Sequence, residues 1–135
     1  MPRELITFQI GQCGNQVASR FWDLAFHEHA SQNLVYDEAW SSFFKNIDKR
    51  NNTQLPFGEQ IRFLKARAIC IDMEEGVLAS LLKSEIADLF DNEWFIQDNP
   101  GSGNNWAVAH FEYGPKYAEA FRERTRIAVE QCDSL

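Results

Sequence analysis

The chain has 135 residues, the size of a single domain, and its 44% hydrophobic and 13% aromatic residues are enough to form a core. Its 13 Lys and Arg against 20 Asp and Glu give a formal charge of −7, which argues against a general nucleic-acid binder because such a surface repels phosphates. No apolar run reaches the about 18 residues of a membrane span, and the first residues do not resemble a signal peptide, so we expect a cytosolic protein.

Residues 5–10 are β-branched and aromatic and predict a β-strand that ends at a glycine. From residue 12 to residue 29, apolar side chains recur at helical spacing. One apolar face consists of Val17, Phe21, Leu24 and Ala25, and a second stripe begins with Trp22 and Phe26. We therefore expect this helix to pack on a sheet with one face and against something else with the other.

Residues 31–62 show no clean period, and we interpret them as an insertion over the surface of the domain. Within them, residues 51–58 are polar and rich in turn-forming residues, which predicts an exposed loop. The aromatic residues Trp40, Phe43 and Phe44 have two interpretations. They fit a place in the core better than a docking surface for another chain.

The second half of the chain alternates between strand and helix patterns. In order, we expect a strand over residues 66–72, short helices over 77–82 and 86–90, a strand over 94–97, a turn over 98–106 and a helix over 116–131. This order predicts an α/β fold, a Rossmann-like parallel sheet with flanking helices. The sheet would contain only three strands.

Cysteine and histidine spacing argues against two kinds of site. The three cysteines are an odd number and lie far apart, at Cys13, Cys70 and Cys132. They predict no disulfide framework. His27 and His29 are two residues apart and would point to different sides of a helix, which disfavours zinc binding. No Gly-x-Ser-x-Gly motif for a nucleophilic serine occurs.

Five of the seven glycines follow a predicted strand, namely Gly11, Gly14, Gly76, Gly101 and Gly103. In an open α/β sheet these loops meet at the carboxyl edge, where ligands bind. Glycine lets backbone N–H groups approach an anion, and the helix N-terminus adds partial positive charge. Residues 11–16 therefore fit a phosphate site, although this spacing alone equally fits a tight turn that binds nothing.

Asp72 and Glu74 follow the second predicted strand. Beside a phosphate they fit ligands of Mg²⁺, whereas alone they fit solvated carboxylates near a helix start. Residues 101–105 add further N–H groups and two amides. Neither a P-loop nor a G-x-G-x-x-G motif occurs. The acid expected about 20 residues after a dinucleotide loop lies much farther away, which disfavours an NAD-type oxidoreductase. We expect a phosphorylated ligand.

Together the loops resemble, in order and spacing, the first three nucleotide-contacting loops of the tubulin family. The matching segments are residues 11–16, 72–76 and 101–107. Flanking segments such as residues 21–25 and 36–39 are more similar to the epsilon class than to alpha or beta tubulins. One departure is Glu75, which stands where alpha and beta tubulins have proline.

The resemblance implies the N-terminal portion of a tubulin GTPase domain, residues 1–135, ending before the family's fourth strand and its glycine-rich loop. By motif match, the residues that would contact the nucleotide are Gly11, Gln12, Cys13, Gln16, Ser102, Gly103 and Asn104. Asp72 and Glu74 would lie near the metal. The implied cofactors are GTP or GDP with Mg²⁺.

The resemblance also implies a cytoskeletal protein of microtubules at centrioles, the centrosome or basal bodies. Its partners would be other tubulins, delta-tubulin among them, and centriolar proteins, with no nucleic acid or membrane. The family hydrolyses GTP in the assembled polymer, with an acid from the neighbouring subunit. We therefore expect weak nucleotide binding and no turnover by this chain alone. The alternative is a partner-binding module that needs no nucleotide and uses an unpaired edge of the first strand.

Overall fold

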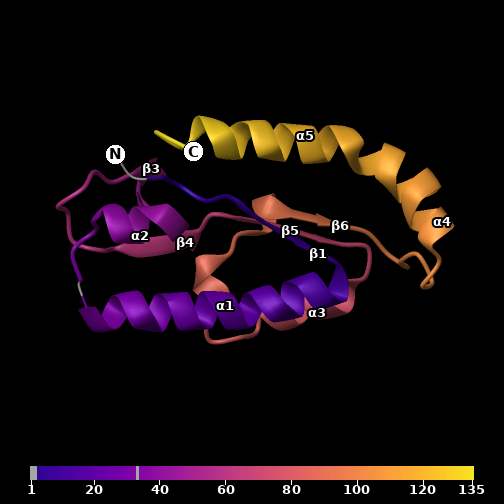
Figure 1. Ribbon diagram of the computed structural model, residues 1–135, viewed down its shortest axis with the longest axis horizontal. Helices are drawn as coiled ribbons and strands as arrows, with labels where there is room; N and C mark the ends of the chain where they lie inside the picture. Colours follow the sequence, from indigo (N-terminus) through magenta and orange to yellow (C-terminus); the bar gives the residue numbers. More distant parts are fainter. Residues whose placement is uncertain (1–2, 33) are drawn as a thin grey trace.

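The structure, a computed structural model, describes residues 3–32 and 34–135 (Figure 1). Its central element is a parallel sheet of three strands in the order β1-β5-β6. The strands are β1 (Thr7–Ile10), β5 (Ala68–Asp72) and β6 (Phe95–Gln97). Helices flank both faces of this sheet (Figure 1). The predicted α/β fold with a three-stranded parallel sheet is therefore confirmed.

The covering helices lie in two layers, one on each face of the sheet (Figure 1). They are α1 (Gly11–Gln32) and α3 (Glu75–Leu81) on one side and α5 (Gly114–Glu130) on the other. The central strand β5 serves both layers because its side chains alternate. Ala68 and Cys70 pack with residues of α1 and α3, whereas Ile69 and Ile71 pack with residues of α5.

The rotation of α1 differs from the prediction. Of the first predicted apolar face, only Ala25 is buried, and Val17 and Leu24 are 65% and 66% exposed. The second stripe faces the core instead, with Trp22 fully buried. Asn15 explains this rotation, because its amide is fixed to the ends of β1 and β5 and residues seven and ten positions later then face the sheet.

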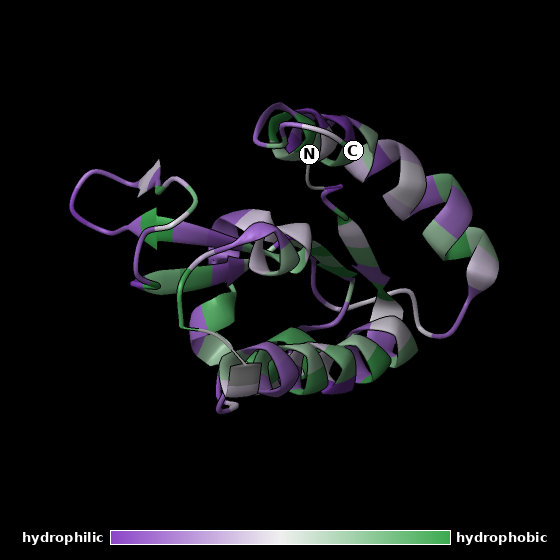
Figure 2. Cartoon of the chain, turned by 60° about the vertical axis from the view of Figure 1, so that its left-hand side comes forward, coloured by the Kyte–Doolittle hydropathy of each residue, from purple (hydrophilic) through white to green (hydrophobic). Residues whose placement is uncertain are grey.

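Residues 38–66 contain a second sheet that the sequence did not predict. Its elements are α2 (Glu38–Phe43), β2 (Phe44–Asp48), β3 (Thr53–Gln54) and β4 (Phe63–Ala66). The strands are antiparallel in the order β3-β2-β4, and β4 leads directly into β5 through Arg67. Residues 51–58 are mostly exposed, and the loop between β2 and β3 projects from the body as a hydrophilic segment (Figure 2).

The aromatic residues of this region belong to the core. Trp40 and Phe44 are 2% and 0% exposed, and their rings meet edge to face with centroids 5.5 Å apart. Phe44 also lies 5.5 Å from the Trp22 ring of α1. Docking of another chain onto Trp40 and Phe44 is therefore excluded, since neither ring reaches the surface.

Three predicted helices have different bounds. The first is α3, the second is only a 3₁₀ turn, η1 (Ala87–Leu89), and the last begins earlier than expected. A further 3₁₀ turn, η2 (Asn92–Trp94), precedes β6, while α4 (Trp106–Val108) and a π-helical turn, η3 (Ala109–Tyr113), precede α5. Helical turns already begin at Trp106, because Asn105 caps α4 by accepting hydrogen bonds from the N–H groups of Ala107 and Val108. None of the helices in the described residues is both long and apolar enough to span a membrane.

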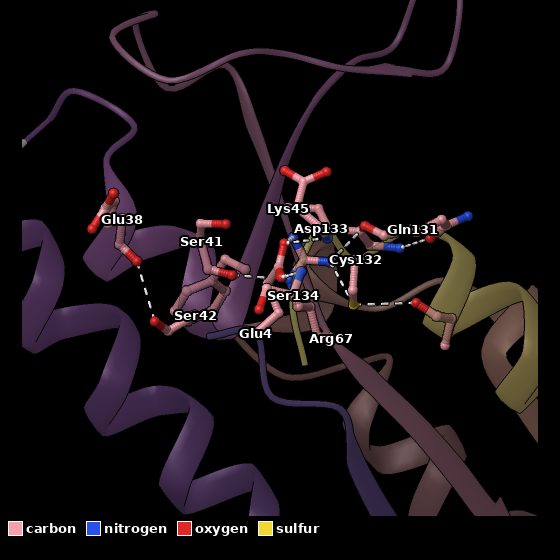
Figure 3. Close-up of polar contacts among 12 residues, drawn as sticks. Glu4, Glu38, Ser41, Ser42, Lys45, Arg67, Gln131, Cys132, Asp133 and Ser134 are labelled. Atoms are coloured by element: carbon pink, nitrogen blue, oxygen red, sulfur yellow. Dashed lines mark hydrogen bonds and ion pairs between the residues drawn. The ribbon is translucent and has the colours of Figure 1, made fainter. Parts of the chain in front are cut away.

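A buried ion pair links Glu4, near the start of the chain, to Arg67 between β4 and β5, and Glu4 also contacts the end of the chain (Figure 3). The side chains of Glu4 and Arg67 are 1% and 2% exposed, and Arg67 Nη2 lies 3.6 Å from Glu4 Oε1. Arg67 Nε donates to the Ser41 carbonyl at 2.9 Å. The Glu4 carboxylate accepts from the N–H groups of Asp133 and Ser134 at 3.1 and 2.8 Å. These contacts fasten the segment after α5 to the entry of β1 and to α2.

Lys45 of β2 lies beside this ion pair (Figure 3). Its Nζ donates to Gln131 Oε1 at 2.7 Å and lies 4.6 Å from the centroid of the Trp94 ring. Burial and, second, the positive charge of Arg67 lower the pKa of Lys45 to about 8. Holding this charge in the folded chain is therefore unfavourable despite its two partners.

We expect Lys45→Met to stabilise the folded chain by about 1 kcal/mol at neutral pH, a modest value because Lys45 is only partly buried. The folded pKa lies below the ordinary value of 10.5, so the unfavourable contribution is complete below pH 8 and disappears as the pH rises to 10.5. The advantage of the variant should shrink across this window in urea unfolding. Lys49→Met is the control. A constant advantage at all pH values would contradict the assignment.

Candidate nucleotide site

Three loops meet at the carboxyl edge of the parallel sheet, as the sequence predicted. Loop 1 is residues 11–16, loop 2 is residues 72–76 and loop 3 is residues 98–105. Ile10 pairs with Ile71, so loops 1 and 2 leave the sheet side by side. Loop 3 follows the neighbouring strand, and the N–H of Asp98 donates to the carbonyl of Asp72 at 3.3 Å. The strand order alone brings together segments that are about 60 residues apart in sequence.

Loop 1 turns directly from β1 into α1. Gly11 has a φ of +73°, a conformation that side-chain-bearing residues rarely adopt. Gln12, Cys13 and Gln16 are exposed in the first turns of the helix. No acidic side chain stands in the first turn of α1, so no carboxylate of the helix itself competes for its positive end and its first N–H groups.

Asn15 fixes loop 1 to its neighbours, a role that sequence analysis missed. Asn15 is only 1% exposed. Its Nδ2 donates hydrogen bonds to three backbone carbonyl oxygens. These belong to Gly11 at 2.9 Å, Ile71 at 3.1 Å and Gln9 at 3.3 Å. The available signal was an asparagine one turn after the glycine, inside a helix, where its intrinsic propensity is poor. Asn15 therefore locks the start of α1 onto the ends of β1 and β5.

The two predicted metal ligands lie in loop 2. Asp72 is 8% exposed, and its Oδ1 accepts from the N–H of Glu74 at 3.2 Å. Its Oδ2 is buried without a hydrogen-bond partner among the described residues. A buried carboxylate oxygen without a donor suits a bound cation or the water of its hydration shell.

The described part of the chain contains no group of three or more His, Cys, Asp and Glu residues that could enclose a metal. Mg²⁺ fits this environment better than a fully protein-ligated cation, because it commonly binds one or two carboxylates together with water and phosphate oxygens. The residues at the edge of the sheet therefore suit a magnesium–phosphate ligand.

Three residues of loop 3 have a positive φ. Gly101, Gly103 and Asn104 have φ values of +94°, +61° and +56°. A Cβ at Gly103 would meet nothing within 4 Å, so the backbone there is open to a ligand. Ser102 is half-buried, while Gly103 and Asn104 are exposed.

Loops 2 and 3 also touch through side chains. The side chain of Glu74 lies against Gly101, where a Cβ would stand 2.6 Å from Glu74 Cγ. Asn99 Nδ2 donates to Glu75 Oε1 at 3.2 Å, so Glu75 links the two loops.

Among the acidic side chains of the three loops, Asp98 has the pKa that departs most from its ordinary value. Its Oδ2 accepts from Lys116 Nζ and from the Tyr117 hydroxyl, both at 2.6 Å. The hydrogen bond from Lys116, followed by that from Tyr117, lowers the pKa of Asp98 to about 2. Asp98 is therefore ionised throughout the neutral range, and sequence analysis missed this cluster because its members come from different elements.

A parallel sheet with three glycine-bearing loops at its carboxyl edge is an open α/β domain, and this edge is where such domains bind their ligands. The chain belongs to the tubulin/FtsZ family, whose GTPase domain matches residues 4–135. It is 48% identical over 135 residues to the tubulin epsilon chain of Mus musculus and 47% identical to that of Homo sapiens, over 96% of this chain in both cases. It is 34% identical over 134 residues to the tubulin beta-1 chain of Homo sapiens, over 98% of this chain.

The chain spans 28% of the length of the epsilon chains and 29% of the beta-1 chain. The predicted resemblance to tubulins, with greater similarity to the epsilon class, is confirmed.

Proposed function

We propose that this chain forms the first wall of a guanine-nucleotide site in an epsilon-type tubulin. The convergence of three glycine-bearing loops beside the start of α1 carries the proposal. Backbone N–H groups and a helix N-terminus bind phosphate oxygens without need of a lysine. This accounts for a phosphate site in a chain that has no P-loop motif.

Each predicted residue then has a role. In loop 1, Gly11, Gln12, Cys13 and Gln16 contact the phosphates and the nucleotide, and in loop 3, Ser102, Gly103 and Asn104 contact the terminal phosphates and the sugar. Asp72 and Glu74 hold Mg²⁺ directly or through its water. The ion would supply positive charge that offsets the charge of the polyphosphate.

Nucleotide binding by these 135 residues alone should be weak. A ligand crevice in this class of sheet needs strands on both sides of β1, and β1 pairs only with β5 in the described residues. Each missing hydrogen bond to a charged phosphate removes about 1.5–3 kcal/mol, about tenfold or more in affinity. We expect a Kd for GTP in about the millimolar range and no hydrolysis.

Calorimetric titration of the chain with GTP, with and without Mg²⁺, tests the proposal. Mg²⁺ should strengthen GTP binding in the natural sequence, and Asp72→Asn should abolish that gain because the buried carboxylate becomes a neutral amide. Asp91→Asn, which changes a surface acid paired with Lys65, is the matched control. Absence of GTP binding at several millimolar, or an undiminished Mg²⁺ effect in Asp72→Asn, would reject the site.

We further propose a cytoskeletal role at centrioles or basal bodies, with other tubulins, including delta-tubulin, and centriolar proteins as partners. The similarity to epsilon chains supports this role. Imaging of the tagged full-length protein together with a centriolar marker tests it, and a uniform cytoplasmic signal would contradict it.

A partner-binding module that needs no nucleotide is the second candidate. The exposed edge strand favours it, because Phe8 and Ile10 of β1 are 39% and 61% exposed. Sedimentation separates the two candidates. A partner module should associate through β1 in the absence of nucleotide, and Ile10→Lys should abolish association without changing GTP binding.

A further inference from the structure

Four side chains fasten loop 3 to the helix that follows it. Asp98, Tyr113, Lys116 and Tyr117 form this cluster, which we call the loop-3 latch. The Tyr113 hydroxyl donates to the carbonyl of Gly101 at 3.0 Å. Lys116 Nζ and the Tyr117 hydroxyl both donate to Asp98 Oδ2 at 2.6 Å.

The two tyrosine rings support one another. Tyr113 and Tyr117 stack with centroids 6.4 Å apart and an interplanar angle of 18°. Lys116 Nζ lies 5.8 and 5.1 Å from their centroids. Tyr113 ends the π-helical turn η3, a type of turn that often marks functional positions. The cluster thus reaches loop 3 from a helical element.

The latch contacts the part of loop 3 that touches loop 2. The N–H of Asp98 donates to the Asp72 carbonyl, and Gly101 lies against the side chain of Glu74. Both anchor points of the latch therefore neighbour a predicted metal ligand. Movement of residues 98–101 would change the spacing between the two loops.

We propose that Asp98, Tyr113 and Tyr117 are positioning residues that hold loop 3 beside loop 2 in the geometry that a nucleotide phosphate requires. This inference rests on the proposed function. A segment with Gly101 and Gly103 has much conformational freedom, and fixing it before the ligand arrives lowers the entropy lost on binding. The latch supplies that order without contacting the ligand.

The hydroxyl groups should matter more than the lysine. The Lys116 side chain is 58% exposed, and exposed ion pairs contribute little because water and salt screen them. The Asp98 side chain is 19% exposed, and the bonds from both tyrosines are partly buried. Phenylalanine keeps the ring stack and removes only the donor, so it is the appropriate substitution.

Hydrogen–deuterium exchange of the ligand-free chain, together with GTP titration in Mg²⁺, tests the latch. Tyr113→Phe should speed exchange of the amides of residues 101–105 by about 3–10-fold and weaken GTP binding by a similar factor. Tyr117→Phe should act in the same direction, and Lys116→Gln less than twofold. Arg126→Gln removes an ion pair to Glu123 (2.6 Å) on the same helix and should change neither quantity.

The outcomes separate the latch from the proposed function. Unchanged loop exchange in Tyr113→Phe overturns the latch, even if the natural sequence binds GTP. Faster loop exchange in a chain that does not bind GTP supports the latch and contradicts the nucleotide site instead. If the variant only lowers the unfolding midpoint and speeds exchange along all of α5, the residues anchor the helix and the latch is overturned.

Discussion

Arg67→Met is expected to lower the free energy of unfolding by about 3–5 kcal/mol, a large share of the stability of a domain of this size. The substitution leaves the Glu4 carboxylate in a place where its side chain is 1% exposed and without its ion-pair partner. The carbonyl of Ser41 also loses its guanidinium donor. An uncompensated buried charge costs far more than the pair contributes when intact.

A second variant separates the ion pair from the packing of the arginine stem. Glu4→Gln combined with Arg67→Met should recover part of the stability, because neither side chain then carries a charge into the interior. Arg62→Met is the matched control, since its ion pair with Asp48 (2.9 Å) involves an arginine side chain that is 48% exposed, and it should cost less than about 1 kcal/mol. Urea unfolding followed by tryptophan fluorescence measures all three. Equal losses for the two single variants would contradict the assignment.

The sheet could be predicted from the sequence because local pattern and tertiary structure agree there. Residues 68–72 form a short apolar run buried on both faces, as expected for a central parallel strand, and glycine-bearing loops follow all three strands. Helices between the strands leave few topologies open.

The antiparallel sheet could not be predicted, because a buried polar residue interrupts its pattern. Asn46 of β2 is fully buried, donates to the carbonyl of Gln60 and accepts from the N–H of Arg62. Asparagine is uncommon in strands and common in turns, so Asn46 does not indicate a strand. The residues that it binds lie 14 and 16 positions away, so the local sequence does not reveal them. The predicted rotation of α1 was wrong for a similar reason. The buried polar side chain of Asn15, and not the apolar pattern, determines which face of the helix packs on the sheet.

The candidate site also contains some parts that the sequence predicts and others that it does not. Its glycines and acids stand at strand ends and are visible in the sequence, whereas the parts that hold the loops in place are contacts between distant residues. Asn15 binds the Ile71 carbonyl across 56 positions, and Tyr117 binds Asp98 across 19. A single sequence contains no local signal for such pairs.

Gly101→Ala is expected to weaken Mg²⁺-dependent GTP binding by about tenfold or more and to lower the free energy of unfolding by about 2–3 kcal/mol. Gly101 has a φ of +94°, which is strained for any residue with a Cβ. The added Cβ would also lie 2.6 Å from Glu74 Cγ and 3.0 Å from Oε1. Because Cγ is close to the backbone, Glu74 cannot avoid the contact by rotating its carboxylate alone. Either Glu74 rotates about its Cα–Cβ bond, which displaces its carboxylate, or loops 2 and 3 separate.

Gly58→Ala is the control that separates the effect of backbone strain from the effect of the contact with Glu74. Gly58 has a similar φ of +87°, but a Cβ there meets nothing within 4 Å. Gly58→Ala should therefore lower the free energy of unfolding by only about 1–2 kcal/mol, the cost of the backbone strain, and leave the affinity for GTP unchanged. Adding Glu74→Ala to Gly101→Ala should restore part of the stability but not the Mg²⁺ dependence, because the space is regained and a carboxylate is lost. If Gly101→Ala and Gly58→Ala lose stability equally and both bind GTP normally, the contact between loops 2 and 3 does not shape the nucleotide site.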